Sequence, residues 1–535
     1  MYMSQIRGAE SKMANTYDIV PYPSKPFSQT HPDRLATIAH LFGLTPQPIN
    51  ECRVLELGCA SGGNLIPMAE QLPASRFVGI DLSARQIEAG QRLLQETGLR
   101  NVELRHMDIL DVDEGFGKFD YIITHGVYSW ISADVRDRLL SVCSNNLAQN
   151  GIAYVSYNVY PGWHMRGMIR DMMLYHAGRF EQPEARVRQA RALLDFLSKN
   201  ASKDSAYGRL LSGELDTLRR HEDGYLFHDH LEYDNEPVYF YQFVVHAKSK
   251  GLQYLGEAEM SAMWAGHLRP EVASTLQRVA SDDVQIEQYM DFLRNRMFRQ
   301  TLLCHEGLRI DRGLKPESLQ PLYVASPLAP VDGDGHLRSA EPMKFQRRNS
   351  DVSLTTSIPL IKAAVSCLAE LWPGSIAYPE LLSQAAKRLE LPLFRGPEQI
   401  KADSEALARS LLEFYLSGIV ELRCSRDLFA VKPGSKPLAS VVARAQVEMG
   451  YRLITNLRHE MGIPDDLTRQ VLPRLDGTNS REDLLSEVQT LINDGALVAP
   501  GGPDAAKDSA GLRGQLAEAL DRSLSYLASN AFCLQ

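Results

Sequence analysis

Two acidic side chains, each at the end of a short apolar run, mark the part of this sequence that could do chemistry. The first run ends in Glu56 and continues into a glycine-rich stretch, Gly58 to Gly63. The second run, Phe77 to Ile80, ends in Asp81. A glycine-rich turn after a strand lets the backbone approach a ligand closely, and a carboxylate at the next strand tip can accept both hydroxyls of a ribose. The pattern predicts a cofactor that contains adenosine.

The glycine-rich stretch differs from a loop that binds a pyrophosphate. Such a loop has the pattern Gly-x-Gly-x-x-Gly, whose second glycine lets the phosphates come close to the backbone. Here Ala60 puts a methyl group at that position, and Glu56 adds a negative charge two residues before the turn. A cationic ligand suits this site better than a pyrophosphate does. S-adenosylmethionine, which has an amino group and a sulfonium, is therefore the predicted cofactor, and a nicotinamide cofactor is the less favoured alternative.

The elements that position these residues alternate between strands and helices. Further strands are predicted over 102–105, 119–124 and 151–157, and a helix over 84–97 ends at Gly98. Strands at 252–257 and 298–304 complete the same sheet, so the catalytic fold extends to about Asp311. The predicted fold class is α/β, a doubly wound, Rossmann-like sheet of seven strands whose ligands bind beyond the carboxyl ends of the strands. Asp108, after the third strand, is predicted to bind an adenine amino group or to cap a helix.

The length of 535 residues predicts several domains. Three helices near 357–371, 379–389 and 404–416, followed by strands at 419–423 and 428–431, suggest a winged helix. A helix is also predicted over 441–461. The predicted division is a core with an N-terminal lid (1–165), a helical insertion (166–235), a segment that completes the sheet (236–312), a linker (313–350), a winged-helix-like domain (351–436) and a small helical C-terminal domain (437–535).

Composition limits the classes of partner. The net charge of −9, and equal numbers of basic and acidic residues over 351–436, argue against nucleic acid as a partner. The seven cysteines include no Cys-x-x-Cys pair, so we predict buried thiols and no metal site. No run of about 18 apolar residues occurs, which predicts a cytoplasmic protein without membrane insertion.

Aromatic residues gather near the predicted strand ends and in the N-terminal segment. A dry aromatic site favours the neutral form of an amine and can hold a methylated cation against ring faces. His31, His125 and His164 are possible proton acceptors. The same rings could instead be ordinary packing residues. The predicted catalytic set comprises Tyr17, Tyr22, His31, His125, Tyr128, Trp130, Tyr157, Tyr160 and Trp163.

The stretch 54–63, with Asp81, Asp108 and the order of the strands, resembles class I S-adenosylmethionine-dependent methyltransferases. The segments 17–24 and 237–243 are similar to bacterial methyltransferases with a so-called methyltransferase regulatory domain. Within that group the chain resembles bacterial protein lysine methyltransferases that act on outer membrane proteins. The resemblance extends to about residue 430 and is weaker beyond it.

The resemblance implies that the loop after the first strand shapes the methionine end of the cofactor site, that Asp81 holds the ribose and that Asp108 meets the adenine. The implied cofactor-binding set is Glu56, Gly58, Cys59, Ala60, Gly62, Asn64, Asp81, Leu82, Asp108, Ile109 and His125.

We therefore predict an N-methyltransferase that acts on lysine side chains of a protein, with an outer membrane protein as the implied acceptor. The insertion and the C-terminal modules are predicted to dock that acceptor, and removal of residues 351–535 to leave cofactor binding intact. One alternative is a methyltransferase for a small molecule. The other is a regulator that senses S-adenosylmethionine and uses the winged helix as its output.

Overall fold

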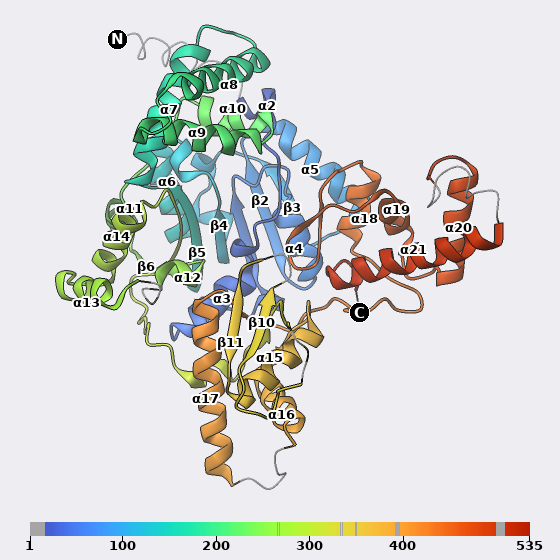
Figure 1. Ribbon diagram of the computed structural model, residues 1–535. Coiled ribbons are helices and arrows are strands. Elements are labelled where there is room, and N and C mark those ends of the chain that lie inside the picture. The colour runs from blue at the N-terminus through green and yellow to red at the C-terminus, as the bar shows by residue number, and fades with distance from the viewer. Residues whose placement is uncertain are drawn as a thin grey trace.

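A computed structural model describes residues 16–264, 266, 268–331, 333, 335–347, 350–390, 396–498 and 509–534. Figure 1 shows a central sheet with a helical layer at its top, a module below it and a further module at its right. Among the described helices, none is both long enough and apolar enough to cross a membrane.

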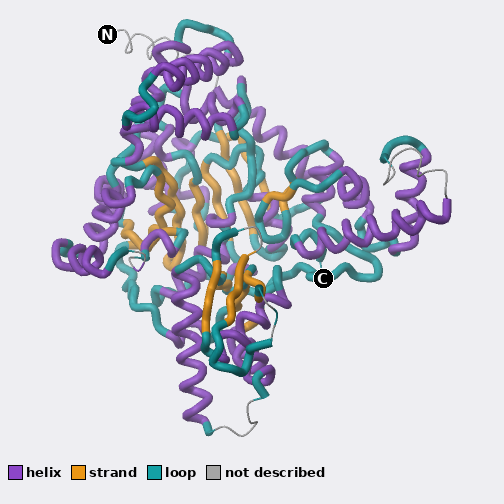
Figure 2. The backbone as a smooth tube through the Cα atoms, viewed as in Figure 1, coloured by secondary structure: helices purple, strands orange, loops and turns teal. Residues whose placement is uncertain are grey.

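The central sheet has seven strands in the order β3-β2-β1-β4-β5-β7-β6. Figure 2 shows strands in orange at the centre of the molecule, with helices around them. The first five pair in parallel, and β7 runs antiparallel to both of its neighbours. The predicted seven-stranded, doubly wound sheet is confirmed, including the two strands assigned to its far edge. The strands are β1 (Arg53–Leu57), β2 (Arg76–Asp81), β3 (Val102–His106), β4 (Phe119–Thr124), β5 (Leu147–Asn158), β6 (Leu252–Glu257) and β7 (Phe298–His305).

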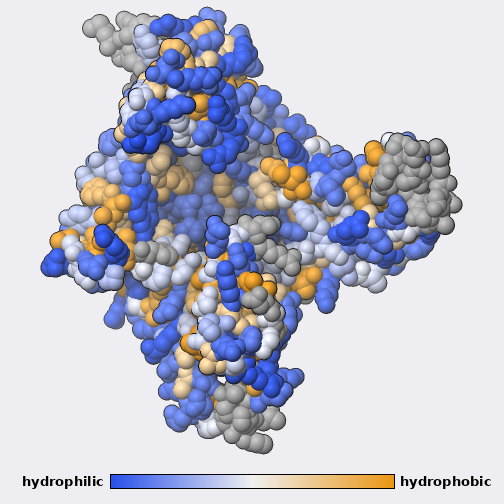
Figure 3. Space-filling view, in the orientation of Figure 1, coloured by the Kyte–Doolittle hydropathy of each residue, from blue (hydrophilic) through white to orange (hydrophobic). Residues whose placement is uncertain are grey.

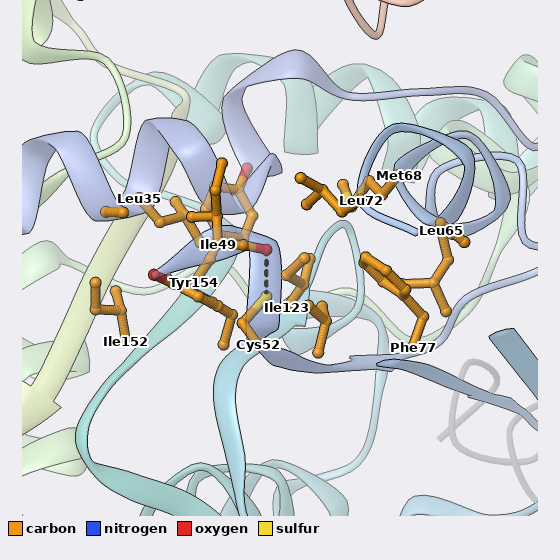
Figure 4. Close-up of a cluster of buried hydrophobic side chains, with 14 of the residues drawn as sticks. Leu35, Ile49, Cys52, Leu65, Met68, Leu72, Phe77, Ile123, Ile152 and Tyr154 are labelled. Carbon is orange, nitrogen blue, oxygen red and sulfur yellow. Dashed lines mark hydrogen bonds between the residues drawn. The ribbon is translucent and has the colours of Figure 1, made fainter. Parts of the chain in front are cut away.

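Helices cover both faces of the sheet, as parallel strands require. Helix α5 (Ala84–Thr97) has the predicted bounds: the Ser83 side chain caps its start, and Gly98, at φ 66°, ends it in the left-handed conformation. One buried cluster packs α3 (Pro32–Leu41) and α4 (Leu65–Gln71) on the sheet, with Leu35, Met68 and Phe77 among its members (Figure 4). The opposite face is covered by α6 (Ala133–Asn145) and α11 (Phe240–Ser249).

The predicted helical insertion consists of four helices that lie at the top of the sheet in Figure 1. They are α7 (Gly162–Ala177), α8 (Pro183–Asn200), α9 (Ala206–Arg219) and α10 (Asp223–Leu231). A buried cluster of their own, which includes Met173, Leu194 and Leu211, holds them together. The short helix α2 (Thr16–Ile19) lies beside them. Three more helices flank the far edge of the sheet, namely α12 (Met260–Met263), α13 (Pro270–Val279) and α14 (Asp283–Arg294).

The module below the sheet in Figure 1, which we call the lower module, differs from the linker predicted over 313–350 and from the ribbon predicted over 419–431. Segment 313–350 contains β8 (Tyr323–Ala325), β9 (Leu328–Pro330) and β10 (Met343–Arg347). β9 pairs with β10 within the segment, whereas β8 and β10 also pair with strands further along the chain. In particular, β13 (Glu421–Arg423) pairs with β8, whereas Phe429 bridges to Leu534. The expected ribbon between 419–423 and 428–431 is therefore replaced by pairings that are distant in sequence. The module also contains β11 (Ser353–Thr356), β12 (Ile376–Ala377), α15 (Pro359–Leu371), α16 (Tyr378–Arg388) and α17 (Pro397–Leu416).

The C-terminal module begins with α18 (Val441–Glu448), which packs on the main core. The helix predicted over 441–461 ends at Glu448, because Gly450, at φ 80°, turns the chain into a hairpin of β14 (Ile454–Thr455) and β15 (Met461–Gly462). The remaining helices are α19 (Asp466–Val471), α20 (Arg481–Asn493) and α21 (Ser509–Ser529), and a buried cluster that includes Leu485 and Leu524 joins them.

Candidate functional site

A cavity of about 650 Å³ lies at the carboxyl ends of the parallel strands, below the helical layer. On the face drawn in Figure 3, the surface is recessed between that layer and the modules below it. Most of the predicted residues line this cavity. They are Tyr17, Tyr22, Glu56, Gly58, Cys59, Ala60, Asn64, Asp81, Leu82, Asp108, Ile109, His125, Trp130 and Trp163.

The loop after β1 is held in shape by backbone contacts to β2. The N–H groups of Gly58 and Cys59 both donate to the carbonyl oxygen of Ile80, at 2.9 and 3.0 Å. Gly58 has a φ of 76°, and a Cβ atom there would lie 2.6 Å from a methyl carbon of Val127. Ala60 takes the left-handed conformation at φ 49°, although it carries a methyl group. The loop is therefore preorganised around the cavity.

Glu56 provides one half-satisfied carboxylate at this loop. Its Oε1 accepts a hydrogen bond of 2.7 Å from the Nδ2 of Asn64. Within the described part of the chain, its Oε2 is buried and has no hydrogen-bond partner. Burial raises the pKa of Glu56 to about 8, against the effect of the Asn64 bond. An unpaired buried carboxylate oxygen fits a cationic ligand group, as the amino group of S-adenosylmethionine is.

Asp81 stands at the tip of β2. Its Oδ2 accepts from the backbone N–H of Ala60 and its Oδ1 from that of Ser83, both at 2.8 Å. These bonds fix the carboxylate but leave lone pairs on both oxygens for ligand hydroxyls. Burial raises the pKa of Asp81, and the two backbone bonds oppose that rise.

Asp108 caps a short helix, which was one of the two roles predicted for it. Its Oδ1 accepts a hydrogen bond of 2.9 Å from the N–H of Leu110 and caps the short helix Ile109–Asp111. The residue also lines the cavity. Capping and contact with a ligand are therefore compatible at this position.

The N-terminal segment passes over the cofactor loop. The Ser24 hydroxyl accepts from the N–H of Gly63 at 2.8 Å, and a Cβ atom on Gly63 would lie 2.7 Å from the Ser24 backbone. The Phe27 N–H donates to the Oδ1 of Asn64 at 2.9 Å, and the Phe27 ring lies 3.8 Å from that of His125. The side chain of His125 bonds Tyr154, and burial lowers its pKa to about 3, so the ring is neutral near pH 7.

Five predicted residues are not among the described residues that line this cavity. Tyr128 and Tyr157 are core residues that pack on Phe243. Their hydroxyls bond His246 and Thr301, at 2.9 Å in each case. Gly62 shapes the loop from behind, with φ 72° and an N–H bond to Cys59.

The other two residues that do not line this cavity are His31 and Tyr160. His31 caps α3, where its Nδ1 accepts from the Asp33 N–H at 3.2 Å, and burial lowers its pKa to about 3. Tyr160 stacks on His164 at 3.9 Å and lines a second cavity of about 770 Å³. Trp163 lines both cavities.

Helix α10 supplies a set of residues that the sequence analysis missed. Tyr225, His228 and Asp229, with Asp234 just beyond the helix, line the cavity. The ring of His228 stacks on Tyr17 at 4.4 Å. Desolvation raises the pKa of Asp229 to about 6, and Arg166 is the main opposing charge. The dense alternation of acids and aromatics over 222–235 is the sequence signal that could have indicated this role.

Among the described residues, no group of three or more histidine, cysteine, aspartate or glutamate side chains could hold a metal ion. The polar residues that line the cavity fall into two groups. We call Glu56, Asn64, Asp81 and the loop 58–63 the cofactor side, and Tyr17, Tyr22, Tyr225, His228, Asp229 and Asp234 the acidic aromatic side.

Three sequence families match parts of the chain. A methyltransferase domain matches residues 55–153, and a predicted methyltransferase regulatory domain matches 222–305. The PKMT C-terminal winged helix domain matches 435–532. That last match covers the segment predicted as a helical C-terminal domain and contains the β14–β15 hairpin, whereas the sequence analysis expected the winged helix over 351–436. We keep the predicted division of the chain, from the core over 1–165 to the C-terminal domain over 437–535, as a proposal.

Similar proteins match over nearly the whole chain. An uncharacterized protein of Rickettsia prowazekii, RP789, is 36% identical over 492 residues, which cover 90% of this chain and 87% of that protein. The structure of PKMT2 from Rickettsia typhi is 33% identical with a TM-score of 0.85, and the match covers 96% of this chain and all of the other. The same PKMT2 in complex with AdoHcy is 32% identical, with a TM-score of 0.86 and the same coverage.

Proposed function

Because the chain belongs to the PKMT family of S-adenosylmethionine-dependent methyltransferases, we propose that it methylates lysine side chains of a protein acceptor. The observation that carries this proposal is that the cofactor side and the acidic aromatic side line one shared cavity. The first part suits a cationic adenosine cofactor, and the second suits an amine that arrives as an ammonium.

On the cofactor side, we assign Glu56 Oε2 to the amino group of the cofactor and Asp81 to its ribose hydroxyls. Asp108 and Ile109 lie further along the same cavity, and we assign them to the adenine. S-adenosylmethionine supplies a methyl group on a sulfonium, which is already activated for an in-line displacement. The task left to the chain is to hold the acceptor nitrogen in line with that methyl group and to remove its proton.

On the acidic aromatic side, we assign proton removal to Asp229. A lysine amine attacks only when it is neutral, so its ammonium must first lose a proton. With a pKa of about 6, Asp229 is largely ionised near pH 7, so it can attract the ammonium and then accept that proton. Its surroundings, Tyr17, Tyr22 and Tyr225, provide ring faces and hydroxyls that favour the neutral amine.

The open recess in Figure 3 supports a protein as the acceptor rather than a fully enclosed small molecule. The match to PKMT2 over 96% of the chain supports it as well, since the modules around the recess are shared. An outer membrane protein as the acceptor, and a cytoplasmic location of the enzyme, are finer parts of this proposal.

Transfer of a radiolabelled methyl group from S-adenosylmethionine into a fractionated cell lysate tests the proposal. We expect label in protein, stable to base and recovered as methyl-lysine after hydrolysis, and a rate of labelling lower by a factor on the order of 100 or more when Asp229→Asn replaces the wild type. Addition of purified outer membrane proteins to the assay tests that acceptor class. Label only in small molecules would favour the first alternative, and tight cofactor binding without any transfer would favour the sensor.

A further inference from the structure

The tip of the β14–β15 hairpin in the C-terminal module reaches the cofactor loop. Residues 456–460 form this tip and connect β14 to β15. Elsewhere in the same module, α18 packs on α4 and α5, beside which it lies in Figure 1. The Nε2 of His459 lies 2.7 Å from the Oδ1 of Asn64. Asn64 is 395 positions earlier in the chain and lines the cavity.

The hydrogen bonds around Asn64 assign the proton on His459. The Nδ2 of Asn64 donates to the Glu56 carboxylate, so its Oδ1 is the acceptor side of the amide. That oxygen accepts from the Phe27 N–H and must also accept from His459. His459 therefore carries its proton on Nε2. Burial lowers the pKa of His459, which agrees with a neutral ring.

The backbone conformation of the tip holds His459 in contact with Asn64. His459 has a φ of 61°, in the left-handed region that residues other than glycine seldom occupy. The Oδ1 of Asn456 accepts from the backbone N–H groups of Arg458 and Glu460, at 2.9 Å in each case. The tip is thus held with the His459 ring buried against the core, where 2% of the residue is exposed.

Arg458 fastens the same tip to the lower module. Its guanidinium makes two hydrogen bonds to Glu421, of 2.6 and 2.7 Å, and lies 4.2 Å from the ring centre of Trp372. It also donates to the carbonyl oxygen of Pro373 at 2.9 Å. The hairpin tip consequently links the C-terminal module to the lower module through Arg458 and to Asn64 through His459.

We propose that His459 is a positioning residue for the cofactor site, which the C-terminal module completes through the chain His459–Asn64–Glu56. The His459 donor, together with the Phe27 N–H, fixes the Asn64 amide so that its NH₂ faces Glu56. One Glu56 oxygen is then occupied, and the other is left for the cation of the cofactor. The inference depends on cofactor use and not on the identity of the methyl acceptor. It replaces the expectation that removal of residues 351–535 leaves cofactor binding intact, because His459 lies in that segment.

A matched pair of variants tests the donor. His459→Leu removes it, whereas His459→Gln keeps an N–H donor on an unbranched side chain of similar size. Leu524→Ala, in the core of the C-terminal module, serves as a control that weakens the module without touching Asn64. Affinity for S-adenosylmethionine is measured by calorimetry on the full chain, together with kcat, KM and the melting temperature.

We expect His459→Leu to weaken cofactor affinity about tenfold, because a hydrogen bond that orients a charged group is lost. The KM for the cofactor should rise by a similar factor while kcat at saturation changes little. His459→Gln should restore most of the affinity, and Leu524→Ala should lower the melting temperature with affinity unchanged. Wild-type affinity in folded His459→Leu, or equal losses in all three variants, would overturn the proposal.

Discussion

The two sides of the cavity are built in different ways. The cofactor side comes from strand tips and one loop, 56–64 and Asp81, and hydrogen bonds of 2.7 to 2.8 Å already hold its carboxylates. The acidic aromatic side combines the N-terminal segment with α10, which lies about two hundred residues later, and ring contacts with one hydrogen bond between His228 and the Val20 carbonyl oxygen join them. The difference indicates that the cofactor side is a rigid part for a cofactor used in every reaction. The acidic aromatic side consists of side chains that contact the acceptor.

The largest expected effect is a loss of reaction rate on the acidic aromatic side without a loss of cofactor affinity. Asp229→Asn removes the proposed proton acceptor, so kcat should fall by a factor on the order of 100 or more. Cofactor affinity should stay unchanged, because the substitution lies on the acidic aromatic side. Single-turnover rates and calorimetry on the same protein measure the two quantities.

The pH dependence provides the control for that variant. Asp229 accepts a proton only as a carboxylate, and its pKa is about 6, so the wild-type rate should rise as the pH increases through about 6. Asp229→Asn should lack this rise. A loss of cofactor affinity equal to the loss of rate would mean that the two sides are not separate.

Asp81→Ala is the matching test on the cofactor side. The ribose hydroxyls would lose a charged partner, and affinity for S-adenosylmethionine should fall about tenfold or more, since such bonds contribute roughly 1.5 to 3 kcal/mol. The rate at saturating cofactor should change far less. Calorimetry that finds wild-type affinity in the folded variant would remove Asp81 from the cofactor site.

The raised pKa of Glu56 gives a smaller effect that is specific to the cofactor side. With a pKa of about 8, Glu56 is mostly protonated at pH 7 in the free protein. A cation beside Oε2 favours the carboxylate, so binding should release about one proton, and this contribution to affinity should strengthen as the pH rises toward 8. Calorimetry at pH 7 in two buffers of different ionisation enthalpy measures the proton. Glu56→Gln should abolish the release, and an unchanged release there would assign the proton to another group.

The smallest effect concerns an aromatic residue predicted for the acceptor site but packed in the core. Tyr157→Phe removes the bond between its hydroxyl and Thr301 and should cost about 0.5 to 1.5 kcal/mol of unfolding free energy. The methylation rate should stay that of the wild type. Denaturant unfolding measures the first quantity, and a large loss of rate without loss of stability would return Tyr157 to the site.

Local sequence was enough for the sheet and for much of the cavity. Short apolar runs with turn signals gave the strands, as at 119–124 and 252–257, because strand formation follows patterns within a few residues. Glu56 and Asp81 were identifiable since a parallel strand brings its last residues to the ligand edge. Tyr157 lies on β5 and packs in the core, because side chains alternate between the faces of a strand and local sequence does not say which face a neighbouring helix covers. Tyr128 lies in the short helix Tyr128–Trp130 and packs on Phe243 of α11, a contact between segments that are distant in sequence.

The sequence by itself therefore determined the cofactor, the type of sheet and the strand-end residues, each of which depends on contacts between near neighbours or on strand order. Only the tertiary structure decided that β13 pairs with β8, that Asp229 and Asp81 line one cavity, and that His459 contacts Asn64. These pairings join segments separated by roughly one hundred to four hundred residues. They depend on how whole modules pack, so no pattern within a single segment could specify them.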